Sequence, residues 1–196
     1  LEEVDIETDH LGVLVNALIE MSRIEMGALV LDKEWCDIVE VIHGALLRLE
    51  RVLSGRPVRT EFQPQLPLIY ADHVQLERVF YNLIEHIVRH SPAESELLIA
   101  VDSVNEDTRD HLRAKVIDRS WRVSVDERER IFKTFSGLRG SGLGLAISRG
   151  IIEAHQGRIG VEAAVDGDGS CYVFTLPLHT YNGASFQAPS VPEDME

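Results

Sequence analysis

Cysteine is scarce in this chain of 196 residues, and the two that it has, Cys36 and Cys171, lie far apart in the sequence. Such a pair forms neither a disulfide framework nor a metal-binding cluster, and it favours a reducing, cytoplasmic compartment. Long apolar runs are missing too, and no stretch matches a signal peptide, so we expect no membrane span within this sequence. Basic residues are also few. The chain has 19 Lys and Arg but 33 Asp and Glu, and the resulting net charge of −14 argues against a nucleic-acid partner.

The composition is otherwise that of a folded domain. Hydrophobic residues make up 44% of the chain and charged residues 27%, which is enough apolar material for one sizeable core plus an appendage. The sequence begins LEEVDIETDH without a Met, so we expect it to be a piece of a longer protein.

Residues 1–28 carry an apolar repeat with alternating steps of three and four residues. Its members are Val4, Leu11, Leu14, Leu18, Met21 and Ala28. The repeat predicts a coiled-coil-type helix that pairs with another helix, although a helix lying on its own domain is an open alternative. Gly27 is expected to end the helix, and residues 29–36 then form a linker with a short strand over 28–35.

The remainder alternates between helix and strand patterns. Asp37 and Asp72 are predicted helix N-caps. The predicted helices cover residues 38–55, 73–90, 126–135 and 143–155, and the predicted strands cover 58–62, 66–71, 96–104, 111–118, 158–165 and 170–178. The order predicts an α+β fold, a two-layer α/β sandwich whose helices cover one face of a mixed, mostly antiparallel sheet. Residues 179–196 are polar and predicted to be disordered.

The stretch GSGLGLAISRG, residues 140–150, places three glycines directly before a predicted helix. Glycines let the backbone approach a ligand closely, and the free N–H groups of a helix N-terminus attract phosphate. No strand comes directly before the glycines, as a dinucleotide-binding motif requires, and no Lys-Ser or Lys-Thr follows, as a P-loop requires. A simple turn into a helix remains the alternative.

The order of motifs is more specific than any one of them. NLIEHIVRHSP on a helix, VID at a strand end, IFKTF and GSGLGLAI together resemble the ATP-binding catalytic domain of sensor histidine kinases. This is the Bergerat fold, which gyrases, Hsp90-type chaperones and MutL proteins share. The resemblance covers residues 37–178, and residues 11–35 resemble the end of the dimerisation helix and its linker. LSGRPV, LPLIYAD and LERVFYNLIEH are most similar to the potassium-responsive KdpD branch.

The resemblance implies a magnesium and phosphate site on the first motif helix. At its four matching positions stand Asn82, His86, Arg89 and His90. Asn82 is the retained amide and the candidate magnesium ligand. His86 replaces the second amide, which implies weakened or lost magnesium binding, because hard magnesium prefers oxygen ligands. Arg89 keeps the positive charge of the usual Lys, and a surface position without a ligand is the alternative for both histidines.

For the base and the remaining phosphates, the resemblance implies contacts from Asp118, Arg139 and the glycine-rich stretch. Asp118 would accept the adenine amino hydrogen, while Ser120 and Arg122 replace glycines that the family has in this loop. Trp121 would then either stack on adenine or fill and block the pocket, and the second reading is favoured. On the phosphate side the matching residues are Arg139 of a short lid, Gly140, Gly142, Leu143 and Gly144.

Two functions follow from this resemblance. In the first, the chain binds ATP and magnesium and phosphorylates a His that lies upstream, for transfer to a response regulator. Its partners are then its own N-terminal helices, a homodimer partner and that regulator. In the second, the altered positions make it a degenerate nucleotide-sensing or scaffold module, a pseudokinase. Either way, no catalytic residue is assigned within this sequence.

Overall fold

The computed structural model describes residues 15, 18–106, 109–133, 143–164 and 169–179. The predictions made for Val4, Leu11, Leu14, Arg139, Gly140, Gly142 and the tail from residue 180 lie outside this part of the chain.

A five-stranded sheet has the order β2-β4-β5-β7-β6. Its strands are β2 (Val58–Phe62), β4 (Leu97–Glu106), β5 (Arg109–Asp118), β7 (Ser170–Pro177) and β6 (Arg158–Ala163). Only β2 and β4 pair in parallel, and the other pairs are antiparallel. The predicted mixed, mostly antiparallel sheet is therefore confirmed.

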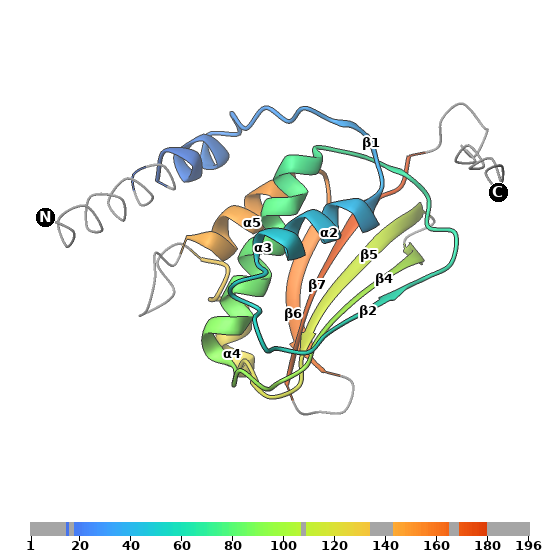
Figure 1. The fold of residues 1–196 in the computed structure, drawn as a ribbon. Helices are drawn as coiled ribbons and strands as arrows, with labels where there is room; N and C mark the ends of the chain where they lie inside the picture. The colour runs from blue at the N-terminus through green and yellow to red at the C-terminus, as the bar shows by residue number, and fades with distance from the viewer. Residues whose placement is uncertain (1–14, 16–17, 107–108, 134–142, 165–168, 180–196) are drawn as a thin grey trace, which may run out of the picture.

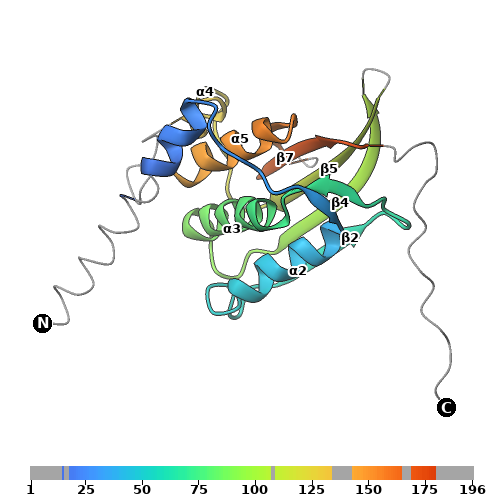
Figure 2. The same cartoon turned by 90° about the horizontal axis from the view of Figure 1, so that it is seen from above.

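Three helices lie together on one face of this sheet, as Figures 1 and 2 show. They are α2 (Ile38–Arg48), α3 (His73–His90) and α5 (Gly144–Ala154), and a single short turn, α4 (Val125–Arg128), precedes α5. Both predicted caps are confirmed: Asp37 accepts from the N–H of Val39 at 2.8 Å, and Asp72 accepts from that of Gln75 at 3.1 Å. The two-layer α+β sandwich is thus as predicted.

Several predicted boundaries are wrong, each for a tertiary reason. The first helix ends at Arg48 rather than near Gly55, because the chain turns to bury Leu53 and Arg56. The strand expected over 28–35 forms only as β1 (Glu34–Cys36), since its partner β3 (Ile69–Ala71) offers three residues to pair with. Within residues 126–133 of the helix expected over 126–135, only α4 forms, after which Phe132 turns into the core, while residues 134 and 135 lie outside the described part of the chain.

The core lies between the apolar face of α3 and the inner face of the sheet. Phe80 on α3 meets Phe174 on β7 edge to face, with ring centroids 5.3 Å apart. Leu83, Ile87 and Tyr172 are fully buried around this pair. Because α3 is fixed against the sheet in this way, the residues on its other side keep a constant position relative to the end of β5.

The described N-terminal helical residues, 18–25, pack against the same domain. Ile24 lies so close to Gly150 of α5 that a Cβ there would sit 2.2 Å from its Cγ2. Glu20 forms an ion pair with Arg78 on α3, and Met21 packs against the core while Leu18 is exposed. Gly27, with φ of 64°, ends the helix as predicted. The coiled-coil pairing remains a prediction. Within the described residues, no helix has the length and apolarity that a membrane crossing needs.

His155 joins the end of α5 to the start of α3. Its Nε2 accepts the backbone N–H of Asp72 at 3.0 Å, so its Nδ1 carries the proton and donates to the Ile151 carbonyl at 2.8 Å. The ring is 4% exposed, and this burial lowers the pKa of His155 and keeps the ring neutral.

We expect His155→Phe to reduce the free energy of unfolding by about 1–3 kcal/mol, because the buried N–H of Asp72 loses its acceptor. Urea denaturation at pH 7.5 measures the change. The matched control, His73→Phe at an exposed position on α3, should change stability by less than about 0.5 kcal/mol. Equal effects of the two substitutions would contradict the account of His155.

Candidate functional site

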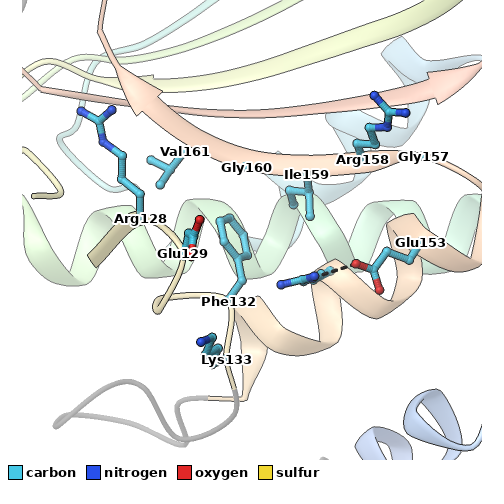
Figure 3. Close-up of a pocket in the computed structure, with 11 residues that line it drawn as sticks. Arg128, Glu129, Phe132, Lys133, Glu153, Gly157, Arg158, Ile159, Gly160 and Val161 are labelled. Carbon is cyan, nitrogen blue, oxygen red and sulfur yellow. Dashed lines mark hydrogen bonds and ion pairs between the residues drawn. The ribbon is translucent and has the colours of Figure 1, made fainter. Parts of the chain in front are cut away.

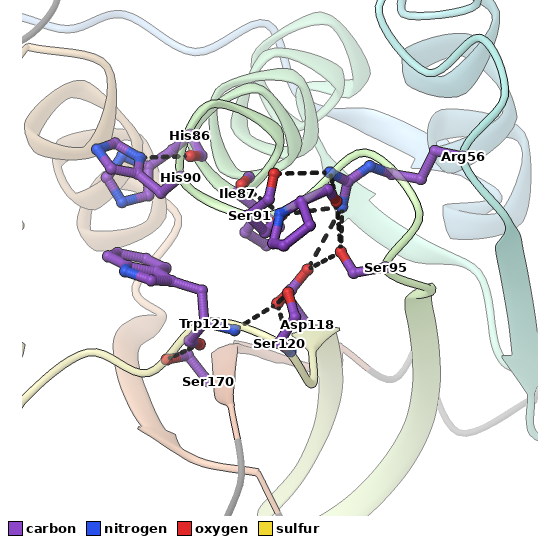
Figure 4. Close-up of polar contacts among 11 residues, drawn as sticks. Arg56, His86, Ile87, His90, Ser91, Ser95, Asp118, Ser120, Trp121 and Ser170 are labelled. Carbon is purple, nitrogen blue, oxygen red and sulfur yellow. Dashed lines mark hydrogen bonds and ion pairs between the residues drawn. The ribbon is translucent and has the colours of Figure 1, made fainter.

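The candidate site lies along the C-terminal half of α3, which contacts the first turn of α5 through Asn82 and Gly144. The last turn of α3 lies beside the end of β5 (Figure 4). Asn82, His86 and His90 are spaced four residues apart on α3 and therefore share one face of the helix. Leu143 and Gly144 lie beside Asn82, whereas Asp118 lies at the opposite end, beyond His90.

Asn82 fastens α3 to the first turn of α5. Its Nδ2 donates to the Gly144 carbonyl at 3.0 Å and to Ser148 Oγ at 3.2 Å. A Cβ at Gly144 would lie 3.5 Å from Asn82 Oδ1, an ordinary van der Waals distance, so this position does not require a glycine for space. Among the described residues, Asn82 Oδ1 has no hydrogen-bond partner, which leaves one oxygen acceptor beside the N-terminus of α5.

His86 lies in an aromatic environment rather than in a metal site. Its ring centroid is 5.7 Å from that of Trp121 and 5.8 Å from that of Tyr172. Burial, aided by the nearby His90 and Arg89, lowers the pKa of His86 to about 4. The ring is therefore neutral at pH 7, and its buried Nε2 has no hydrogen-bond partner within the part of the chain that the structure describes.

His90 and Arg89 lie in the last turn of the same helix. The His90 ring stacks on Trp121 with centroids 4.9 Å apart and planes at 23°, and its Nδ1 lies 2.8 Å from the His86 carbonyl. Arg89 forms an ion pair at 2.6 Å with Glu85 on its own helix. The positive charge of Arg89 is thus partly neutralised by Glu85, which weakens any attraction of Arg89 for a phosphate group.

The loop after β5 avoids the backbone strain that its missing glycines suggested. In the described residues, the non-glycine positions with positive φ are Gln65 and Gln156, so neither Ser120 nor Arg122 is strained. The loop follows another path: the Trp121 carbonyl accepts from Ser170 Oγ at 3.0 Å. The position that requires a glycine is instead Gly169, where φ is 99° and a Cβ would lie 2.1 Å from the Asp118 carbonyl oxygen.

Asp118 is fully buried and surrounded by donors. Its Oδ1 accepts from Ser120 N at 2.8 Å, Ser120 Oγ at 2.7 Å and Trp121 N at 2.9 Å. Its Oδ2 accepts from Ser95 Oγ at 2.9 Å and from the Arg56 guanidinium at 3.4 Å. Burial alone would raise the pKa of Asp118, but the hydrogen bonds from Ser120 and Ser95 outweigh it and hold the pKa below its ordinary value.

Sequence reasoning missed Arg56, Ser95 and Ser170. Arg56 is separated by 62 positions from Asp118, and no local pattern signals the contact.

The donor set does not fit a magnesium ion. Asn82 offers one amide oxygen, and the corresponding atom of His86 is a neutral imidazole nitrogen that faces aromatic rings. The described residues contain no group of three or more His, Cys, Asp or Glu side chains placed to hold a metal. Magnesium prefers octahedral oxygen ligands, so this end of the site is poorly matched to it.

A second hollow lies away from these residues, between α4, α5 and β6 (Figure 3). Its volume is about 570 Å³, its floor includes Phe132 and Val161, and Arg128, Lys133 and Arg158 are among its lining residues. None of the predicted site residues lines it, and it plays no part in the site described above.

The structure brings together most of the predicted residues that it describes. Asn82, Leu143 and Gly144 meet at one end, His86 and His90 lie along the middle, and Asp118 closes the other end. Arg89 is adjacent but paired with Glu85. Trp121 stacks on His90, and whether it fills the pocket or contacts a base stays a prediction.

Comparisons with known proteins agree with this architecture. The sequence family described as "Histidine kinase-, DNA gyrase B-, and HSP90-like ATPase" matches residues 71–180. The sensor protein KdpD of Escherichia coli is 36% identical over 173 residues, which cover 85% of this chain and 19% of KdpD. The sensory kinase SasA of Prochlorococcus marinus is 30% identical over 179 residues, 87% of this chain and 47% of SasA. The chain thus spans less than half the length of these two relatives.

Solved structures of histidine kinases have the same fold. Full-length ShkA in complex with AMPPNP superimposes with a TM-score of 0.78 at 27% identity, over 92% of this chain and 37% of ShkA. The histidine kinase ThkA in complex with the response regulator TrrA gives a TM-score of 0.67 at 21% identity, over 91% of this chain and 51% of that one.

We expect the buried, neutral state of His86 to make stability depend on pH. The pKa of His86 is 6.5 in the unfolded chain and about 4 in the folded one. Between these two pH values, the unfolded chain therefore binds a proton at His86 that the folded chain does not bind. The contribution of the neutral His86 ring to the free energy of unfolding is therefore fully present above pH 6.5 and is lost as the pH falls toward 4. His86→Phe should remove about 1–2 kcal/mol of the stability difference between pH 7 and pH 5, measured by urea denaturation.

His86→Asn provides the matched comparison, because Asn does not titrate in this range either. Both variants should lose the same part of the pH dependence, even if their stabilities at pH 7 differ. A slope that neither substitution changes would show that His86 is not the group responsible.

Proposed function

The chain belongs to the histidine kinase-, DNA gyrase B- and HSP90-like ATPases, and on that premise we propose that it is the nucleotide-binding domain of a two-component sensor kinase. In the longer protein, this domain would supply the γ-phosphate of ATP to a His that lies N-terminal to this sequence. The phosphoryl group would then pass to a response regulator. ThkA, a structural neighbour, is known in complex with such a regulator, which supports this choice of partner.

The observation that carries the proposal is the contact between Asn82 and the first turn of α5. The amide holds Gly144 in place, and α5 is an 11-residue helix whose N-terminal N–H groups supply positive potential for phosphate. Asn82 Oδ1 lies at the same junction and has no other partner among the described residues. Phosphate oxygens would therefore lie between α3 and α5.

A second candidate function, nucleotide sensing or scaffolding without phosphoryl transfer, is favoured by the His86 environment. Phosphoryl transfer relies on a metal ion that neutralises the developing charge, and the donor set at Asn82 and His86 does not fit magnesium. Nucleotide would then bind through the helix N-terminus and the aromatic surface of Trp121 and His90 alone. The two candidates differ in one measurable property, which is the dependence of nucleotide affinity on magnesium.

The sensing candidate predicts that the affinity of the chain for ADP depends only weakly on magnesium, by less than about threefold, because His86 provides no oxygen ligand. The kinase candidate predicts a dependence of about tenfold or more. His86→Asn should make that affinity at least about tenfold tighter in the presence of magnesium and leave it nearly unchanged in EDTA. Isothermal titration calorimetry with ADP, in magnesium and in EDTA, measures both values.

His90→Asn is the control, since it places the same amide one turn further along α3, away from Gly144. It should not restore dependence on magnesium. Strong magnesium dependence in the unaltered chain would support the kinase and contradict the sensing candidate. Absence of binding at millimolar ADP under every condition would contradict nucleotide binding altogether.

A further inference from the structure

Arg56 is an unusual residue to find inside this domain. It follows Gly55, whose φ of 82° turns the chain inward after α2, and it is only 8% exposed. Its Nη1 donates to Ser91 Oγ at 2.9 Å and to Ser95 Oγ at 2.8 Å, and its Nη2 donates to the carbonyls of Ser91 at 3.2 Å and Pro92 at 2.6 Å. The guanidinium is thus tied to the end of α3 and the turn that follows it.

The same guanidinium reaches Asp118, where it joins a crowded set of donors (Figure 4). Donors from Arg56, Ser95, Ser120 and Trp121 make five contacts with the two carboxylate oxygens. An ionised carboxylate offers about four lone-pair sites. Three donors fill Oδ1, while Oδ2 faces the Ser95 hydroxyl, which also lies 2.9 Å from the Pro92 carbonyl, and the Arg56 guanidinium at 3.4 Å. The side chain has no exposed surface, so a ligand reaches Asp118 only if one of these protein groups moves.

This arrangement matters because the resemblance to histidine kinases assigns Asp118 to the amino group of adenine. An amino group is a donor, and it needs an acceptor with a free lone pair at the floor of the pocket. Arg56 and Ser95 occupy Oδ2, while Ser120 and Trp121 occupy Oδ1. To bind the amino group, Asp118 would have to release one of these donors.

We propose that Arg56 and Ser95 sequester Asp118, so that this site binds purine nucleotides without selecting the 6-amino group of adenine. The proposal rests on nucleotide binding between α3 and α5 and adds the base specificity of that site. Recognition would come from phosphate contacts and from stacking on the aromatic surface of Trp121 and His90, which accepts any purine ring. Arg56 acts as a positioning residue, because it works through Asp118.

The direct test compares ADP with IDP, which carries a 6-oxo group in place of the amino group. Calorimetric titration of the unaltered chain should give dissociation constants for the two nucleotides within about threefold of each other. A preference for ADP of about tenfold or more is what a free charged acceptor would produce, and it would overturn the proposal.

Ser95→Ala provides the second variant, since it removes the hydroxyl donor from Oδ2, together with the acceptor that Ser95 Oγ offers to Arg56, while the positive charge of Arg56 remains. The ratio of the two dissociation constants should then shift by about fivefold or more in favour of ADP, a readout that general loosening of the fold would not move. Ser103→Ala, at the opposite end of β4, is the control and should leave the ratio unchanged.

The two proposals fail in different ways. If the unaltered chain binds ADP and IDP but strongly prefers ADP, nucleotide binding stands and sequestration is wrong. If it binds neither nucleotide at millimolar concentration, nucleotide binding by the unaltered chain is wrong. In that case, ADP binding gained by Ser95→Ala would uphold sequestration of Asp118, and no gain would overturn it.

Discussion

The buried carboxylate of Asp118 is the group on which the arrangement of this site depends. A charge with no exposure to solvent must be paired and hydrogen-bonded, or it destabilises the fold. Here the pairing draws in Arg56 from the loop after α2, Ser95 from the turn before β4 and the backbone of the loop after β5. Since Trp121 is held by that loop, its stacking on His90 also follows from how Asp118 is satisfied.

The two ends of the site consequently differ in their contacts. At the end near α5, Asn82 joins α3 to the start of α5 through the Gly144 carbonyl. At the end near β5, protein groups contact one another: the loop after β5, Ser95 and Arg56 donate to Asp118, and Trp121 stacks on His90. His86, between the two ends, is a neutral ring among aromatic neighbours. A ligand bound here would thus be held by its phosphates more than by its base.

The sequence predicts those features that depend on residues close together in the chain. The caps at Asp37 and Asp72, the apolar face of α3 and the element order are of this kind, and the motif order predicted the fold and the family. Features that depend on distant contacts were missed. The end of α2 depends on the burial of Leu53 and Arg56, and the relaxed backbone at Ser120 depends on Gly169 of the closing hairpin. Nothing near Arg56 in the sequence indicates its contact with Asp118.

Hydrogen–deuterium exchange of the chain with and without saturating ADP tests most directly whether nucleotide binds between α3 and α5. The account predicts slower exchange in three segments that are distant in sequence: residues 83–90, 118–123 and 143–148. Exchange elsewhere, including residues 157–161 of the second hollow, should not change. Protection confined to that hollow, or no protection anywhere at millimolar ADP, would contradict the account.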